Sequence, residues 1–578
     1  MPDSHTYESM RRRMELMYEA SKRIGASLDV RETAQGIADL LVPAMGDMAF
    51  VDLAEEVLTG DEPPRHEQLK TPPRLMRAAT SGDLPHGLLG VDEKVPLPAP
   101  KSRHRDVLDK EAVFVTRLRP ADASVREMDP QALRRLVPPD ARSMIMAPLY
   151  ARGLVMGMAV IMQCREEWSG DDDDLRLLAQ ITSRGALAID NARRYEREYR
   201  TAVTLQRRLL PPAVTDTSSA ETYAAHLPAG RRGAGGGDWF DVIPLSSARV
   251  ALVTGTVSGH GLQASATMGR LRSAMYTLAD LDLEPDELLT HLDDLVRRLN
   301  AENDMGGEPV RATCTYLVHD PVRRRCSVAS AGHSVPVLAP ADGPLTPVPV
   351  SPGPALGTDG APFEVSEWEA APGSLVAMYT NGLPEALVSA DAESSGRTSK
   401  GPEPVLGTLR AMPLPRLQLA DISDRLLDGV DNSGPPHDVV LLMCRLKTFD
   451  EAHNARWSLE ARPELVAPIR AAVTKCLTTW GLDDLIVTTS ELVLSELVTN
   501  SVRYAGGPLE VRLIRMAQSL VCEVSDPSST QPRLRRARST DEGGRGLFLV
   551  AQMTARWGCR YGHEGKTIWT EQPLTVDL

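Results

Sequence analysis

A glycine-rich turn near the middle of the chain constrains the fold more than any other feature. The three consecutive glycines Gly235–Gly237 lead directly into Asp238. A strand-like run over Val250–Val257 then ends in a second turn, Ser258–Gly261. Glycine permits positive φ and close approach of backbones, so turns of this kind can aim short side chains at one place. The sequence therefore predicts a small polar site around Asp238.

Length, charge and cysteine usage define the class of protein. A chain of 578 residues favours three or more domains, and its 42% hydrophobic and 25% charged residues are typical of a soluble globular protein. The net charge of −14 argues against nucleic acid as a partner. The N-terminus lacks the apolar segment of a signal peptide, no apolar run could span a membrane, and the seven cysteines are scattered singly. We expect a cytoplasmic protein with reduced thiols that binds neither nucleic acid nor membrane.

The first third of the chain reads as a short tail followed by a mixed helix and strand domain. Apolar residues at helical spacing predict helix over 10–45, and a hairpin is predicted over 144–164. Residues 1–18 are assigned to an N-terminal helix or tail. Residues 19–195 resemble a GAF domain, most specifically in the hairpin and in the closing helix ending Ile189–Arg193. This resemblance implies either a sensor of a small molecule or a purely dimerising module.

The closing helix is predicted to continue through residues 180–212. Small and apolar residues follow a heptad-like spacing until Pro211 and Pro212 stop the helix. One interpretation is a signalling coiled coil, through which this linker and the GAF-like domain would form a homodimer. The other is a single amphipathic helix docked on its own domain.

Residues 213–447 alternate predicted strands and helices. Helices are expected over 261–278 and 284–299, and a solvent loop over 389–405. The segments that carry a family pattern are GGGDWFDVIPL, the turn at 255–261, Ala331–His333, Pro354–Gly357, Tyr379–Leu383 and Asp438–Val439. Their order resembles SpoIIE-like phosphatases, which are metal-dependent PPM-type serine/threonine phosphatases. The resemblance implies a β-sandwich flanked by helices, with metals at the sandwich edge.

That family uses two Mg²⁺ or Mn²⁺ ions to activate a water that attacks phosphoserine or phosphothreonine. Hard cations need oxygen ligands, preferably carboxylates, and the first family ligand falls on Asp238. The remaining three acidic positions fall on Thr256, Asn381 and His437. Most of the negative charge of the metal site is therefore missing. The prediction is an inactive phosphatase domain in which Mn²⁺ or Mg²⁺ binding is doubtful.

Two alternatives keep a phosphatase in this domain. The first is an active metal-dependent serine/threonine phosphatase that acts on an anti-sigma antagonist despite the losses. The second is a single-metal or transition-metal site built from Asp238, Asp241, His437 and Asp438. Asp241 and Asp438 could equally be turn and strand-edge residues, and His333 is interpreted as a structural hydrogen-bonder.

Residues 452–578 contain a second set of motifs. A predicted helix over 491–505 places Glu496 and Asn500 on one face, because they are separated by four positions. A strand over 521–526 ends in Asp526, and a glycine-rich loop over 541–546 leads into another helix. Backbone N–H groups of such a loop at a helix N-terminus can hold phosphate. A last strand is predicted over 566–569.

The order of these motifs resembles the Bergerat-fold (GHKL) ATPases and, among them, the RsbW-like anti-sigma serine kinases. By that resemblance Asn500 coordinates Mg²⁺, Glu496 is the catalytic base and Asp526 binds the adenine amino group. The other ATP-binding positions implied are Gly543, Gly544 and Gly546 in the lid and Thr567 on the final strand. The cofactor implied is ATP with Mg²⁺.

The chain departs from this pattern directly after Asp526. Pro527 and Ser528 stand where many relatives have glycine, and a proline removes one N–H donor from the loop. Basic residues precede the lid at Arg533, Arg535, Arg536 and Arg538. They either steer phosphate or an acidic partner, or form a solvated basic face.

Together the motifs predict a multidomain α/β (α+β) regulator of the partner-switching type. A GAF-like sensor, an inactive phosphatase-like domain and an ATP-dependent serine kinase domain would follow one another in the chain. The partners implied by the resemblance are a STAS-domain anti-sigma antagonist, a sigma factor, or both. The alternative to an enzyme is a non-catalytic scaffold that binds these partners.

Overall fold

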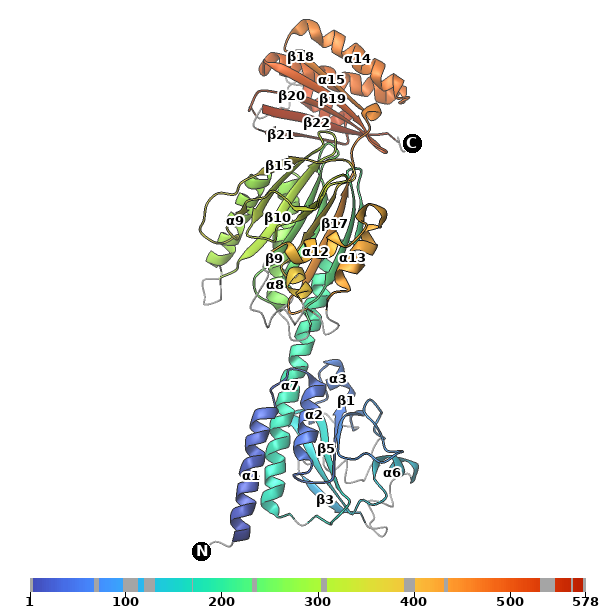
Figure 1. Cartoon of the computed structure of the whole chain (residues 1–578). Helices are drawn as coiled ribbons and strands as arrows, with labels where there is room; N and C mark the ends of the chain where they lie inside the picture. Colours follow the sequence, from blue (N-terminus) through green and yellow to red (C-terminus); the bar gives the residue numbers. More distant parts are fainter. Residues whose placement is uncertain are drawn as a thin grey trace. The chain divides into compact units, whose positions relative to one another are not determined.

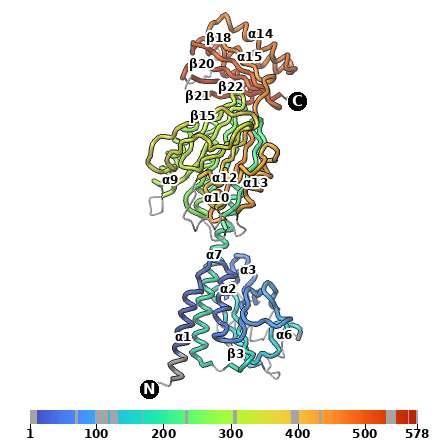
Figure 2. The backbone as a smooth tube through the Cα atoms, viewed as in Figure 1, coloured from blue at the N-terminus to red at the C-terminus, as the bar shows by residue number. Residues whose placement is uncertain are grey.

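The fold is described from a computed structural model (Figures 1 and 2). It covers residues 4–66, 72–96, 113–118, 130–168, 170–230, 236–302, 309–388, 401–430, 435–530, 546–562 and 565–574. The chain divides into two compact units, Met1–Thr201 and Ala202–Leu578. Among the described residues, no helix is both long enough and apolar enough to cross a membrane.

The first unit is an antiparallel sheet with helices packed against it. Its strands, in the order β2-β1-β5-β4-β3, are Leu75–Ser81, Met48–Ala54, Leu154–Gln163, Ser143–Ala151 and Phe114–Arg117. Its helices are α1 (Ser4–Arg23), α2 (Val30–Leu41), α3 (Glu55–Thr59), α6 (Pro130–Leu136) and the first part of α7 (Asp172–Leu209). Side chains of α1, α2 and α7 share one apolar core with the sheet. The predicted hairpin is confirmed as β4 and β5.

The helical region predicted near 10–45 consists of two helices, α1 and α2, in the structure. Gly25 lies between them with φ +89°, a conformation that glycine adopts without strain. Asp29 then caps α2 by accepting hydrogen bonds from the backbone N–H groups of Arg31 and Glu32. The break places α1 beside the start of α7, where Arg13 pairs with Asp174 at 2.8 Å.

The second unit begins with two six-stranded sheets that form a sandwich. One contains β8 (Asp238–Pro244), β9 (Val250–Val257), β10 (Ala312–Asp320), β11 (Arg325–Ala331), β14 (Pro352–Gly353) and β15 (Ser366–Glu369). The other contains β6 (Val214–Asp216), β7 (Ala220–Leu227), β12 (Val337–Ala339), β13 (Thr346–Pro347), β16 (Leu375–Tyr379) and β17 (Val439–Leu446). An apolar core fills the space between the sheets.

Helices cover the outer face of each sheet, which confirms the predicted β-sandwich flanked by helices. Helices α8 (Gly261–Ala279) and α9 (Pro285–Glu302) pack on the sheet that contains β9. Helices α10 (Gly382–Leu387), α12 (Glu403–Arg410) and α13 (Leu419–Leu427) pack on the other. Since both faces of β9 are covered, its residues form an almost continuous apolar run rather than an alternating one. The loop predicted over 389–405 is wrong at its end, because α12 begins at Glu403, and residues 389–400 lie outside the described part.

The C-terminal part of this unit is a five-stranded antiparallel sheet with helices on one face. Its strands, in the order β18-β19-β20-β22-β21, are Asn454–Glu460, Pro508–Arg515, Ser519–Asp526, Gly565–Pro573 and Arg556–Gly562. The helices are α14 (Val466–Thr479), α15 (Asp484–Tyr504) and α16 (Gly546–Met553). Apolar residues of α14 and α15 pack against the sheet. The mixed α/β class predicted for the whole chain is confirmed.

Candidate functional sites

The glycine turn brings two of the predicted metal-site residues together at the sandwich edge. Asp238 begins β8 and lies directly opposite Thr256 of β9 in the antiparallel register. A Cβ on Gly237 would lie 2.3 Å from the carbonyl oxygen of Val257, so only glycine fits there. Gly236 takes a φ of +117°, which also favours glycine. The turn therefore places Asp238 at the start of β8, where the backbones of the turn and of β9 lie close together.

Asp238 is almost fully buried, with 6% of its surface exposed. Burial, together with the negative charge of Asp438, raises the pKa of the Asp238 carboxyl group to about 8. The hydroxyl groups of Thr380 and Thr256 oppose this rise but do not cancel it.

The neighbouring Asp438 is surrounded by hydrogen-bond donors from the chain itself. Its Oδ2 accepts from Gln206 Nε2 and from the backbone N–H of Gly236, both at 2.7 Å. Its Oδ1 accepts from the backbone N–H of Ala229 at 2.8 Å. Burial raises the pKa of this carboxyl group, but the hydrogen bonds outweigh burial and hold the pKa below its usual value. Asp438 is thus an ionised carboxylate stabilised by N–H groups.

Gln206 is one residue that the sequence interpretation did not assign to this site. It lies in the last turns of α7, is completely buried, and also donates to the backbone carbonyl of Asp238 at 3.1 Å. The available signal was a glutamine on the apolar side of the helix end, next to Leu205 and Leu209. Thr380, whose hydroxyl group lies beside Asp238, was missed as well. Both residues are distant from Asp238 in the sequence.

Asn381 and His437, the other two predicted metal-ligand positions, each have a polar neighbour other than Asp238. Asn381 accepts a hydrogen bond from the Ser334 hydroxyl group at 2.5 Å. His437 is exposed on 56% of its side-chain surface and lies 3.7 Å from Glu385.

Asp241 and His333 each contact another side chain of the sandwich domain. Asp241 pairs with Arg272 at 2.7 Å, so it is a strand residue held by an arginine. His333 is buried beside the Thr313 hydroxyl group at 2.9 Å, and burial lowers the pKa of its imidazole to about 3.

The C-terminal motifs also come together. Glu496 and Asn500 lie on α15, facing the N-terminal end of α16, which begins at Gly546. A methyl group on Gly546 would lie 2.5 Å from Glu496 Oε2 and 3.3 Å from Asn500 Nδ2. The glycine therefore lets the start of a helix approach both polar side chains. A helix N-terminus presents free N–H groups and positive potential, which suit phosphate.

Asp526 is the last residue of β20, and its side chain accepts hydrogen bonds from three groups. The Ser501 hydroxyl group donates to Oδ2 at 2.9 Å, and Lys566 Nζ donates to Oδ1 at 2.8 Å. The backbone N–H of Ser528 donates to Oδ1 at 3.0 Å, so the residue after Pro527 supplies a donor in this loop.

Thr567, one position after Lys566, hydrogen-bonds the Ser525 hydroxyl group at 2.8 Å. The remaining positions predicted near the nucleotide lie outside the described residues. These are Gly543, Gly544, Arg533, Arg535, Arg536 and Arg538.

The C-terminal sheet contacts the sandwich domain through a buried charged pair. Arg560 of β21 binds Glu523 of β20 at 2.6 Å, and both side chains are less than a tenth exposed. The same guanidinium donates to the Ser247 hydroxyl group, in the turn between β8 and β9, at 2.8 Å. At the edge of this contact Arg556 pairs with Asp280 at 3.1 Å. Within the second unit, the two domains are therefore joined by specific polar contacts.

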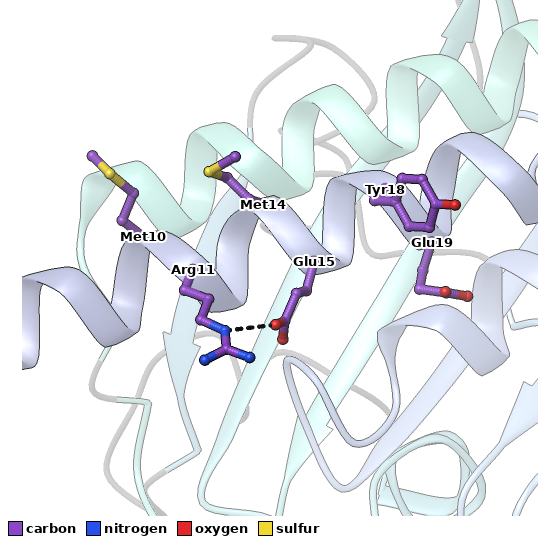
Figure 3. A pocket seen from close by; sticks show the side chains of 6 residues that line it. All are labelled: Met10, Arg11, Met14, Glu15, Tyr18 and Glu19. Atoms are coloured by element: carbon purple, nitrogen blue, oxygen red, sulfur yellow. Dashed lines mark hydrogen bonds and ion pairs between the residues drawn. The ribbon is translucent and has the colours of Figure 1, made fainter.

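The first unit carries an exposed apolar stripe on α1. Met10, Met14 and Tyr18 are separated by four positions each and are 60%, 69% and 69% exposed. Figure 3 shows them beside Arg11, Glu15 and Glu19, with Arg11 paired to Glu15 at 2.9 Å. Exposed apolar side chains at helical spacing form a face that another helix can cover.

Family models match three successive segments of the chain. A GAF domain model matches residues 29–189, and the model of Stage II sporulation protein E (SpoIIE) matches residues 246–447. A histidine kinase-like ATPase domain model matches residues 459–571. The chain thus combines a GAF domain, a SpoIIE-type phosphatase domain and a histidine kinase-like ATPase domain, as its motifs predicted.

Solved structures of similar domains come from several bacteria. The RsbU and RsbW domains of Rv1364c from Mycobacterium tuberculosis are 23% identical, over 63% of this chain and 97% of that one, with a TM-score of 0.35. The SiaA-PP2C domain of Pseudomonas aeruginosa is 16% identical, over 44% and 96%, with a TM-score of 0.34. The phosphatase domain of SpoIIE from Bacillus subtilis, with a fragment of its regulatory domain, is 14% identical, over 40% and 65%, with a TM-score of 0.32.

Proposed function

We propose that this chain is a partner-switching regulator whose C-terminal domain is an ATP-dependent serine kinase and whose phosphatase-like domain does not catalyse hydrolysis. The single observation that carries the proposal is the contrast between two sites of one chain. At the sandwich edge the carboxylates are bound by the chain's own donors. At the start of α16, Gly546 lets a helix N-terminus lie against two half-buried polar side chains, Glu496 and Asn500.

The residues at the sandwich edge do not suit a pair of divalent cations. Such ions require several anionic oxygens with free lone pairs. Thr256 stands opposite Asp238 in the strand register and carries no charge, and the Asp438 carboxylate accepts hydrogen bonds from three N–H donors. In the described part of the chain, no group of three or more His, Cys, Asp or Glu residues could hold a metal ion. We therefore derive no hydrolytic step at this site.

The residues of the C-terminal domain suit Mg²⁺-ATP and a serine substrate. The Asn500 amide oxygen is a hard ligand for Mg²⁺, and Asp526 would accept a hydrogen bond from the adenine amino group. Gly543, Gly544 and Gly546 would cover the phosphates, and Thr567 would line the base site. Glu496 would take the proton from the attacking serine hydroxyl group. ATP, when bound, would supply the γ-phosphoryl group for transfer to the serine oxygen, with ADP as the leaving group.

The proposed partners follow from the resemblance to anti-sigma kinases. The serine substrate would belong to a STAS-domain antagonist, and a sigma factor would be bound in its place when the antagonist is phosphorylated. A second copy of the chain would bind through the GAF domain and the helix that follows it. The stripe of Met10, Met14 and Tyr18 on α1 supports a helical contact of this kind.

The kinase proposal is tested with the full chain and a candidate antagonist. Labelled phosphate should pass from the γ-position of ATP to the antagonist in the wild type. Asn500→Ala should lose both Mg²⁺-ATP binding and transfer. Glu496→Gln should bind ATP but transfer poorly, because the amide cannot accept the proton. A wild-type chain that binds the partner without transferring phosphate would instead support the non-catalytic scaffold.

The inactive phosphatase is tested separately. Titration with Mn²⁺ should give no hydrolysis of a phosphoserine substrate above background. Hydrolysis that rises with Mn²⁺ and disappears in Asp238→Ala would overturn the proposal and favour the active phosphatase. Asp359→Ala, at a fully exposed carboxylate, is the matched control.

A further inference from the structure

A lysine lies buried beside the carboxylate proposed to bind adenine. Lys566 of β22 is directly opposite Asp526 of β20 in the antiparallel register, and the lysine is 8% exposed. Its Nζ lies 2.8 Å from Asp526 Oδ1. Gly565, with φ +134°, precedes it, and a Cβ there would lie 2.1 Å from the backbone carbonyl oxygen of Asp526. Close strand pairing therefore holds the two side chains next to each other.

The fold alone does not account for this lysine. Lysine is among the residues least often buried, and a buried ion pair returns little net stability because both charges lose their hydration. Ser501 already ties the same carboxylate to α15. An apolar side chain at position 566 would have packed at lower cost. A buried ammonium group at this place therefore points to a ligand.

Both members of the pair keep hydrogen-bonding capacity. An ammonium group has three N–H donors, and only the bond to Asp526 uses one of them among the described contacts. A carboxylate can accept about four hydrogen bonds, and Asp526 accepts three. The site thus offers a donor and an acceptor side by side. The complementary ligand edge carries an acceptor beside a donor.

We propose that Lys566 is a specificity-determining residue that donates to N1 of adenine while Asp526 accepts from the N6 amino group. The inference rests on the proposed ATP binding of this domain. Adenine presents N6–H and N1 in the required order. Guanine presents O6 and N1–H at the same two places, which sets an acceptor against Asp526 and a donor against Lys566. Guanine would therefore bind poorly, because neither Asp526 nor Lys566 could form a hydrogen bond with it.

The test compares nucleotides that differ at one ring atom. Binding of ATP, 1-deaza-ATP, 7-deaza-ATP and GTP to the full chain is measured by calorimetry. The wild type should bind 1-deaza-ATP about tenfold to a hundredfold more weakly than ATP, as expected for losing a hydrogen bond from a charged donor. GTP should bind at least as weakly, and 7-deaza-ATP should match ATP. In Lys566→Met the difference between ATP and 1-deaza-ATP should disappear.

Lys475→Met, which removes an exposed lysine from α14, is the control and should keep the wild-type preferences. The wild-type comparison needs no variant, so it can overturn the inference even if Lys566→Met does not fold. Equal binding of ATP and 1-deaza-ATP by the wild type would overturn this inference and leave the kinase proposal standing. Failure of the wild type to bind ATP would overturn both.

Discussion

Removing Arg560 should destabilise the C-terminal domain in a way that depends on pH. Arg560→Met keeps much of the side-chain volume and removes the charge, which leaves the Glu523 carboxylate without its closest counter-ion. Burial alone raises the pKa of Glu523, but Arg560 and Arg512 outweigh burial and lower it to about 2. The ordinary value is 4.5. Glu523 is therefore ionised in the folded domain at any pH above the acid range.

The shift sets the size of the effect. A depression of this extent corresponds to about 3 kcal/mol of stability, since one pKa unit is about 1.4 kcal/mol. Because the folded pKa is the lower one, this contribution is complete above about pH 4.5 and is lost as the pH falls toward 2. Breaking a buried pair typically costs about 3–5 kcal/mol. We expect Arg560→Met to cost about 3 kcal/mol at pH 7 and progressively less as acid protonates Glu523.

Amide hydrogen exchange of β20 and β21 measures this effect without assuming that the whole chain unfolds at once. The double variant Arg560→Met, Glu523→Gln should recover most of the protection, because the buried carboxylate that loses its counter-ion in the single variant is no longer present. Ser247→Ala removes one neutral partner of Arg560 and should cost about 1 kcal/mol or less. If Arg560→Met exchanges like the wild type at pH 7, or if the double variant is no better than the single one, the reasoning is refuted.

Three further changes give sharp expectations. Gln206→Leu removes one donor from the buried Asp438 carboxylate and should lower the free energy of unfolding by about 1–3 kcal/mol, measured by urea titration. Gly255→Ala would place a methyl group 2.3 Å from the ring of Trp239, which lies opposite on β8. It should lower the free energy of unfolding by about 1–3 kcal/mol in the same assay. Gly546→Ala crowds Glu496 and should weaken ATP binding about tenfold, equivalent to roughly 1.4 kcal/mol, with little change in the thermal midpoint.

Local patterns in the sequence were enough to identify the elements and the three domain types. The helix with Glu496 and Asn500, the strand ending in Asp526 and the hairpin over 144–164 all depend on periodicity and turns within a few residues. Helical spacing near 10–45 could not show the break between α1 and α2, because glycine is tolerated within a helical pattern, whereas Gly25 takes a positive φ here.

The contacts of the site residues could not be predicted from local sequence patterns. Gln206 and Asp438 are 232 positions apart, and nothing in either segment specifies the other. The same holds for Lys566, which meets Asp526 across 40 positions through strand pairing. The family pattern predicted the ligand positions at Thr256, Asn381 and His437, but it could not predict the N–H donors around Asp438. Such partners depend on tertiary packing.

The N–H groups around Asp438 also bear on the history of the domain. A single reversion, such as Thr256→Asp, would add a carboxylate opposite Asp238 while the donors from Gln206, Gly236 and Ala229 stay in place. Like charges in a buried pocket repel each other. The Thr256→Asp substitution alone would therefore lower the stability of the domain unless a bound cation compensated the added charge. If the phosphatase-like domain is inactive as proposed, restoring a metal site would therefore require several substitutions made together.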